Sequence, residues 1–235
     1  MFAERIAQIQ RLSAEERAEL TQKLDAERRR AELQKVAGLR REAGIPDRFS
    51  NARFFDLDRD PNNAEALDAA AAVIDGGFHA GLGLWGPVGV GKTTIAASIA
   101  NAALASGVTV RFCSVAGFMD TLQEASRFSA VDDVSDLIAR YASVQVLVLD
   151  DLGREPLTRR TLPWLYELLN QRWLKERPIL LPTNYSFGSL TARYIDAAKR
   201  AGEDVSLAEA IVDRLADLCP QPWVKVGGIS RRGAA

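Results

Sequence analysis

The stretch GPVGVGKT at residues 86–93 carries the most information about the fold. It matches the pattern G-x-x-x-x-G-K-[ST], whose glycines let the backbone wrap closely around phosphate groups with N–H groups pointing inward. A short apolar run at 81–85 precedes it, and a helical pattern at 92–106 follows it. Because this pattern requires a strand before it and a helix after it, we predict a phosphate-binding loop here.

The residue types in this loop indicate that it binds ATP or ADP together with Mg²⁺. We expect Lys92 to reach the β- and γ-phosphates and the Thr93 hydroxyl to coordinate Mg²⁺. The helix that starts at Lys92 directs the positive end of its dipole at the same anion. Thr94 is expected to pack or cap beside the nucleotide. The predicted nucleotide contacts are Gly86, Pro87, Val88, Gly89, Val90, Gly91, Lys92, Thr93 and Thr94.

A second motif, VLVLDD at residues 146–151, is an apolar run that ends in two acids. A buried strand of this kind releases its carboxylates at the carboxyl end, beside bound phosphates. We predict that Asp150 binds Mg²⁺ and that Asp151 is the base that orients the attacking water. Asn184 follows the next apolar run, 179–183, and its amide could bond the water or the γ-phosphate, or simply turn the chain.

The order of apolar and amphipathic runs predicts an α/β fold with a parallel sheet covered by helices on both faces. The stretch 93–110 has no charged residue over 18 positions, and we interpret it as a buried helix running into a strand rather than a membrane span. The expected strands are 81–85, 108–114, 144–149 and 179–183, and the expected helices are 92–106, 116–142 in two pieces, and 162–175.

The N-terminal part differs in composition. Residues 1–42 are rich in Glu, Arg, Ala and Gln, and Ser13 with Glu16 forms a capping-box pattern for a long helix. We predict a helical extension at 1–42, which is either a solvated helix or an arm that docks a partner, and an ATPase domain at 43–235. Residues 43–62 resemble a linker, and Asp60 followed by proline predicts the start of another helix.

The bulk composition limits the class of protein. With 30 basic and 31 acidic residues the net charge is −1, so any DNA contact must come from a local patch. Two cysteines and one histidine give neither a disulfide framework nor a zinc site. The charged N-terminus does not fit a signal peptide, and we expect a reduced, cytoplasmic protein with no membrane association.

The motifs together resemble a known family. The set GPVGVGKT, VLVLDDLG, LPWLYELLNQRW, ILLPTNYS and EAIVDRL is similar to the DnaC/IstB group of AAA+ ATPases, which are bacterial replicative helicase loaders and transposition helper ATPases. The resemblance covers about residues 43–232 and includes AGIPDRFSNARF at 43–54. It implies an AAA+ P-loop NTPase fold and hydrolysis of ATP to ADP and phosphate.

The resemblance also implies roles for single residues. Asn184 falls at the sensor-1 position, and Arg214 falls where the family has the arginine finger that enters a neighbouring subunit's ATP site. Without the family, Arg214 reads as a surface arginine on an amphipathic helix. Arg232 matches the sensor-2 arginine near the C-terminus, and Arg172 is expected to contact a neighbour or the nucleotide. A homo-oligomer with ATP sites between subunits is therefore expected.

DNA contacts are expected on the helical stretch 116–142, where aromatic and basic residues alternate, as suits stacking with single strands. The candidates there are Phe118, for which we favour a core position, Arg127, Phe128 and Arg140. Phosphate contact or plain surface charge is expected for Lys175, Arg177, Arg159 and Arg160.

The leading hypothesis is an ATP-dependent loader that binds single-stranded DNA and helps to load a replicative DNA helicase. The alternatives are an IstB-like transposition helper that binds duplex DNA, and an ATP-binding regulatory adaptor with little turnover. Helicase loaders of this group often carry a Cys-rich zinc-binding N-terminal domain. Since no cysteine precedes Cys113, residues 1–42 cannot be that module.

Overall fold

The computed structural model describes residues 13–128, 131–202, 204–220 and 222–230. The chain divides into two compact units, and the boundary in the sequence lies between Leu39 and Arg40. Most of helix α2, Ala14–Ala43, belongs to the first unit. The predicted capping box is confirmed at its start. The Ser13 amide donates to Glu16 Oε2 at 2.8 Å, and the Glu16 amide donates to Ser13 Oγ at 3.2 Å.

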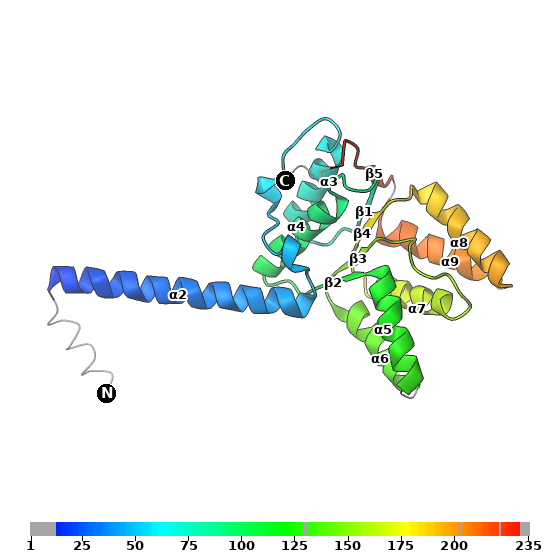
Figure 1. The fold of residues 1–235 in the computed structure, drawn as a ribbon, viewed down its shortest axis with the longest axis horizontal. Coiled ribbons are helices and arrows are strands. Elements are labelled where there is room, and N and C mark those ends of the chain that lie inside the picture. The colour runs from blue at the N-terminus through cyan, green and yellow to red at the C-terminus, as the bar shows by residue number, and fades with distance from the viewer. Residues whose placement is uncertain (1–12, 129–130, 203, 221, 231–235) are drawn as a thin grey trace. The chain divides into compact units, whose positions relative to one another are not determined.

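The second unit is built on a parallel sheet in the order β2-β3-β4-β1-β5 (Figure 1). Its strands are β1 (Leu82–Trp85), β2 (Val110–Ser114), β3 (Val146–Asp150), β4 (Ile179–Thr183) and β5 (Val224–Lys225). The first four occur where the apolar runs predict them, whereas β5 was not predicted because two residues leave no periodic pattern.

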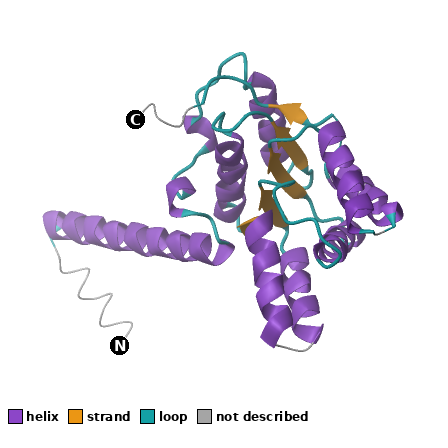
Figure 2. Ribbon diagram, turned by 45° about the vertical axis from the view of Figure 1, so that its right-hand side comes forward, coloured by secondary structure: helices purple, strands orange, loops and turns teal. Residues whose placement is uncertain are grey.

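Helices cover both faces of this sheet, as Figures 1 and 2 show: α3 and α4 lie on one side, and α7, α8 and α9 on the other. Short 3₁₀ turns η1 (Asp47–Phe49) and η2 (Phe54–Asp56) precede α3. The helices are α3 (Ala64–Asp75), α4 (Lys92–Ala105), α5 (Val115–Phe128), α6 (Val131–Ser143), α7 (Thr161–Leu174), α8 (Phe187–Ala201) and α9 (Val205–Leu218). The predicted α/β fold class is therefore confirmed.

Strand β3 explains why the predicted apolar run has no polar alternation. All five of its residues are buried. Leu147 and Leu149 join the hydrophobic core formed with α5 to α9, while Val146 and Val148 alternate to the face that α4 covers. Burial on both faces demands apolar residues at every position, and Asp150 is the exception because it ends the strand at the functional edge.

Helix α4 confirms the interpretation of the uncharged stretch 93–110, because it is largely buried and leads into β2. In the part of the chain that the structure describes, no helix is long and apolar enough to cross a bilayer.

Two local predictions need correction. The helix expected at Pro61 begins at Ala64, because the Asp60 carboxylate bonds the Asn62 amide and closes a turn first. The segment 43–62 is not a bare linker. Asn101 of α4 donates from Nδ2 to the main-chain carbonyls of Phe49 at 2.9 Å and Ala52 at 3.0 Å, and so holds the segment against α4.

Arg172 of α7 is fully buried, so the expected contact with a neighbour or the nucleotide is wrong. Its guanidinium joins the end of α6 to the segment before β4 by bonding main-chain carbonyls that would otherwise lie unpaired in the core. The acceptors are Tyr141 (3.1 Å), Ala142 (3.4 Å), Val144 (3.1 Å), Gln145 (3.2 Å) and Pro178.

Replacing Arg172 with Met should therefore destabilise the fold by about 3–5 kcal/mol, since the carbonyls lose their donor in a buried place. The free energy of unfolding in urea measures this loss. Lys175→Met is the matched control, because Lys175 is exposed at the end of the same helix. Equal midpoints for the two variants would contradict the structural role of Arg172.

Candidate nucleotide-binding site

The carboxyl ends of three neighbouring strands form the site. β3, β4 and β1 are adjacent in the sheet and parallel, so the segments that leave them meet at one edge. The loop 86–91 follows β1, Asp151 follows β3, and Asn184 follows β4. The sequence motifs, far apart along the chain, are thus brought together as predicted.

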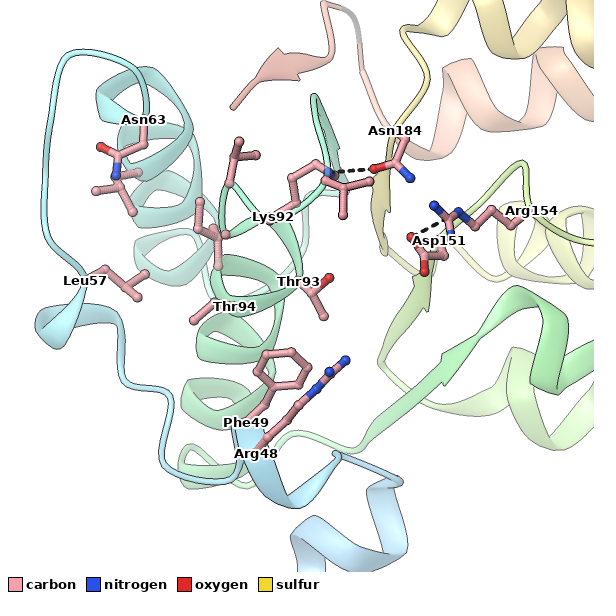
Figure 3. A pocket seen from close by; sticks show the side chains of 16 residues that line it. Arg48, Phe49, Leu57, Asn63, Lys92, Thr93, Thr94, Asp151, Arg154 and Asn184 are labelled. Carbon is pink, nitrogen blue, oxygen red and sulfur yellow. Dashed lines mark hydrogen bonds and ion pairs between the residues drawn. The ribbon is translucent and has the colours of Figure 1, made fainter. Parts of the chain in front are cut away.

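Lys92 lies at the centre of this edge. Its Nζ donates to the carbonyl oxygens of Gly86 at 2.8 Å and Pro87 at 2.7 Å, and to Asn184 Oδ1 at 2.9 Å. Figure 3 shows the last bond, which spans the gap between the loop and the end of β4. The lysine is 6% exposed and lines the cavity at this edge, where bound phosphate would compete with these three acceptors for its ammonium group.

Thr93 and Asp150 form a donor set that suits Mg²⁺. The Thr93 hydroxyl donates to Asp150 Oδ1 at 3.1 Å, and the Asp151 amide donates to the same oxygen at 3.0 Å. Burial, with the nearby Asp151 charge, raises the pKa of Asp150 to about 6. A buried carboxylate beside a hydroxyl is a hard-oxygen pair that a divalent cation would stabilise in its ionised form.

The backbone of the loop leaves room for phosphates. Gly89 and Gly91 adopt φ values of 89° and 102°, which side chains other than glycine rarely tolerate. A Cβ atom at Gly91 would meet nothing within 4 Å, so the space beside its backbone is open. Gly86 is glycine for another reason, because a Cβ there would lie 2.0 Å from the carbonyl oxygen of Val226. The loop therefore fits the predicted phosphate cradle.

Asp151 reaches the cavity while Asp150 stays behind it. Asp151 has a φ of 56°, a left-handed conformation that aspartate tolerates better than most residues. Its side chain is 46% exposed and lies 4.0 Å from the Nε of Arg154, as measured from Oδ1 (Figure 3). The turn after β3 thus separates the two neighbouring acids, one buried at the Thr93 hydroxyl and one facing solvent.

The cavity has a volume of about 320 Å³ and includes residues that the sequence did not predict. Segment 43–62 supplies one wall, in which the Arg48 guanidinium lies 4.5 Å from the centre of the Phe49 ring (Figure 3). Arg48 and Phe49 lie within the stretch AGIPDRFSNARF, which carries part of the family resemblance. The composition of that stretch did not indicate a contact with the nucleotide. The unpredicted lining residues are Arg48, Phe49, Leu57, Asn63, Leu67, Ile95 and Arg154.

The predicted residues Gly86, Pro87 and Asp150 contact residues that line this cavity without lining it themselves, and Arg214 is not brought to it. Arg214 lies on α9, where its Nε donates to Asn170 Oδ1 at 3.1 Å and its guanidinium lies 4.0 Å from the centre of the Trp173 ring. Arg232 lies outside the described residues. Its neighbour Ser230 lies close to the loop, since a Cβ at Gly89 would meet the Ser230 hydroxyl at 2.1 Å.

The structure shows the burial of three of the four candidates for DNA contact on α5 and α6, and their contact with DNA stays a prediction. Phe118 is fully buried against Tyr141, with ring centres 4.8 Å apart, so the core position favoured for it is confirmed. Arg127 and Arg140 are exposed. The side chain of Phe128 lies outside the described part of the structure.

The loop after Asp151 is anchored by a buried carboxylate. Glu155 is 1% exposed. Its Oε2 accepts from the Gly153 amide at 2.7 Å, and its Oε1 accepts from the Tyr194 hydroxyl of α8. Burial raises the pKa of Glu155, and these hydrogen bonds oppose the shift. The two hydrogen bonds of Glu155 connect the segment that carries Asp151 to α8.

The sequence matches a known family along most of its length. A family model described as IstB-like ATP binding protein covers residues 5–234. An insertion sequence IS21 putative ATP-binding protein from Pseudomonas aeruginosa is 32% identical over 132 residues, 56% of this chain and 45% of that protein. The replicative helicase loader DnaC of Escherichia coli is 26% identical over 106 residues, 45% of this chain and 43% of that protein. The chain spans about half the length of these relatives.

Solved structures agree on the fold. The crystal structure of DnaI superposes with a TM-score of 0.62 and 24% identity, over 80% of this chain and 94% of that one. An identity this low bears on the fold alone, and the superposition agrees with the fold that the family resemblance implies.

The raised pKa of Glu155 predicts a pH-dependent stability. The folded protein holds this proton to higher pH than the unfolded chain, so stability falls as pH rises above the ordinary value of 4.5. Glu155→Gln keeps a side chain that can bond both partners and cannot ionise. It should be more stable than the wild type at about pH 8 and nearly equal to it at about pH 4.

Melting temperatures at both pH values test this expectation. Glu155→Ala is the control for anchoring, because it loses both hydrogen bonds and should melt lower at either pH. A constant difference between the Gln variant and the wild type would show that ionisation of Glu155 does not matter.

Proposed function

Because the chain belongs to the family of IstB-like ATP-binding proteins, we propose that it hydrolyses ATP with Mg²⁺ and works on DNA as an assembly factor for a partner protein. ATP binding comes with the family. The hydrolysis, the DNA and the partner are the proposal.

One observation carries the hydrolysis step: Lys92, Thr93, Asp150, Asp151 and Asn184 converge on one edge of the sheet from three strands. In the proposed roles, Thr93 and Asp150 would hold Mg²⁺, which would neutralise charge on the phosphates. Asp151 orients the attacking water and accepts its proton. Asn184 already accepts from Lys92 through Oδ1, which leaves its amide nitrogen to donate to the γ-phosphate.

The position of Arg214 supports a finger that acts on a second copy of the chain. Its side chain is 22% exposed and is held by Asn170 and the Trp173 ring, away from the residues that line its own cavity. Trp173 and Leu174 beside it are exposed apolar residues, at 39% and 65%. Tryptophan and arginine are enriched at protein interfaces, so this surface suits contact with a neighbouring subunit.

A mixing experiment tests the finger in trans. Lys92→Ala subunits lack a working phosphate loop but keep Arg214, whereas Arg214→Ala subunits keep the loop and lose the finger. Each variant alone should release little phosphate from ATP, and the Arg214→Ala variant should still bind a fluorescent ATP analogue. The mixture should exceed the sum of the two, because some interfaces join an intact loop to an intact finger.

Glu209→Ala, on the exposed side of the same helix, is the control and should behave as the wild type. Turnover in the mixture that equals the sum of the separate variants would rule out a finger in trans. Full activity of Arg214→Ala alone would remove the arginine from the mechanism.

Of the two candidate roles for this protein, we favour that of a transposition helper over that of a helicase loader. The family model and the Pseudomonas aeruginosa relative, which is named for an insertion sequence, support this choice. A helicase loader is the second candidate, and the match to DnaC favours it. Helix α2 is a candidate docking arm in either case, since its described side chains are mostly exposed.

Size-exclusion chromatography separates the two candidates. The protein is mixed with duplex or single-stranded DNA, and with the host's replicative helicase or an insertion-sequence transposase, in ATP, in ADP and without nucleotide. We expect an ATP-dependent complex with duplex DNA and the transposase. A complex restricted to single strands and the helicase would establish the loader instead. Tight ATP binding without turnover would establish the regulatory adaptor.

A further inference from the structure

A second cavity, which is shallow and open to solvent and has a volume of about 710 Å³, lies between the loop that follows β3 and helix α8. Its lining is rich in arginine. Arg154 and Arg159 come from the loop, and Arg193 and Arg200 come from α8. Three of these, Arg154, Arg159 and Arg200, are exposed residues. In a chain with a net charge of −1, this is a local concentration of positive charge.

Glu155 is the acidic residue among the described lining, and its single charge, which acts on Arg193, cannot offset four guanidinium groups. Both carboxylate oxygens of Glu155 are occupied, by the Gly153 amide and the Tyr194 hydroxyl, and the side chain is buried. Arg200 donates from Nε to a neutral main-chain carbonyl, that of Asp196, at 3.2 Å.

Arg193 has unused hydrogen-bonding capacity. Its guanidinium lies 5.5 Å from the centre of the Tyr185 ring, and its Nε is buried without a hydrogen-bond partner among the described residues. A buried donor of this kind is stabilised by an acceptor that enters the cavity. Anions with several oxygens match the fork of a guanidinium best.

We propose that this cavity binds phosphate groups of a nucleic-acid backbone. A polyanion with regularly spaced phosphates can contact guanidinium groups from both the loop and α8 at once. The inference rests on the DNA association proposed above and assigns it to a surface distinct from helices α5 and α6.

Arg154 connects this cavity to the nucleotide site. It lines both cavities, and its Nε lies 4.0 Å from Asp151. A phosphate that draws Arg154 into the second cavity weakens its pairing with Asp151, the proposed base. Nucleic acid bound there therefore changes the rate of ATP hydrolysis through one side chain.

The test measures anisotropy of a fluorescent single-stranded oligodeoxynucleotide, and of the matching duplex, over a range of salt concentrations. Arg159→Ala and Arg200→Ala should each weaken binding several-fold, whatever the base sequence. Each should also reduce the slope of log affinity against log salt by about 0.7 for single strands or 0.9 for duplex, as expected for one lost phosphate contact. Arg200→Lys should recover much of the loss, because the charge returns.

Lys199→Ala is the matched control, since it removes the adjacent charge on the same helix and lines neither cavity. It should keep both the wild-type affinity and the change in ATP turnover on adding DNA, which the two arginine variants should lose. Variants that bind like Lys199→Ala would overturn this site.

Two further outcomes are distinguishable. Displacement of the oligonucleotide by inorganic tripolyphosphate at an equal phosphate concentration would identify the cavity as a site for free polyphosphate and overturn the nucleic-acid assignment. A wild-type protein that binds neither oligonucleotide, with or without ATP, would contradict the proposed DNA function itself.

Discussion

The site depends on one constraint, the adjacency of β3, β4 and β1 as parallel strands. Parallel pairing brings their carboxyl ends to the same edge, so the phosphate loop, the two acids and Asn184 meet without any long insertion. The Lys92 bond to Asn184 spans the junction between β1 and β4, and the Thr93 bond to Asp150 spans that between α4 and β3. The nucleotide-binding geometry is therefore a direct consequence of sheet order.

Buried polar groups hold the elements around this edge in place. Arg172 joins the end of α6 to the segment before β4 through main-chain carbonyls, Asn101 fixes the segment that forms one wall of the cavity, and Glu155 joins the loop after β3 to α8. Each of these side chains satisfies backbone groups or partners that would be costly to leave unpaired. The same interactions that stabilise the fold thus fix the positions of Asp151 and Arg154.

The charge distribution links the fold to the proposed work on DNA. A near-neutral chain would not attract nucleic acid as a whole, but α8 and the loop after β3 gather guanidinium groups beside the nucleotide cavity. Arg154 belongs to both surfaces. In the proposed function, a residue that lines both surfaces offers one route by which DNA binding and ATP hydrolysis could be coupled.

Motif spacing and apolar periodicity were sufficient to predict four strands, the parallel α/β fold, the phosphate loop, and the acids and amide at the strand ends. These features follow from local rules: glycines around phosphates, unbroken apolar runs in buried strands, and acids at strand ends. The wall formed by Arg48 and Phe49, the burial of Arg172, the anchoring of Glu155 and the arginine cavity could not be predicted from the sequence. Each of these features joins segments that are far apart in the chain. The amino-acid composition is the same whether a charged side chain is solvated, buried or part of a site, so it could not distinguish these cases.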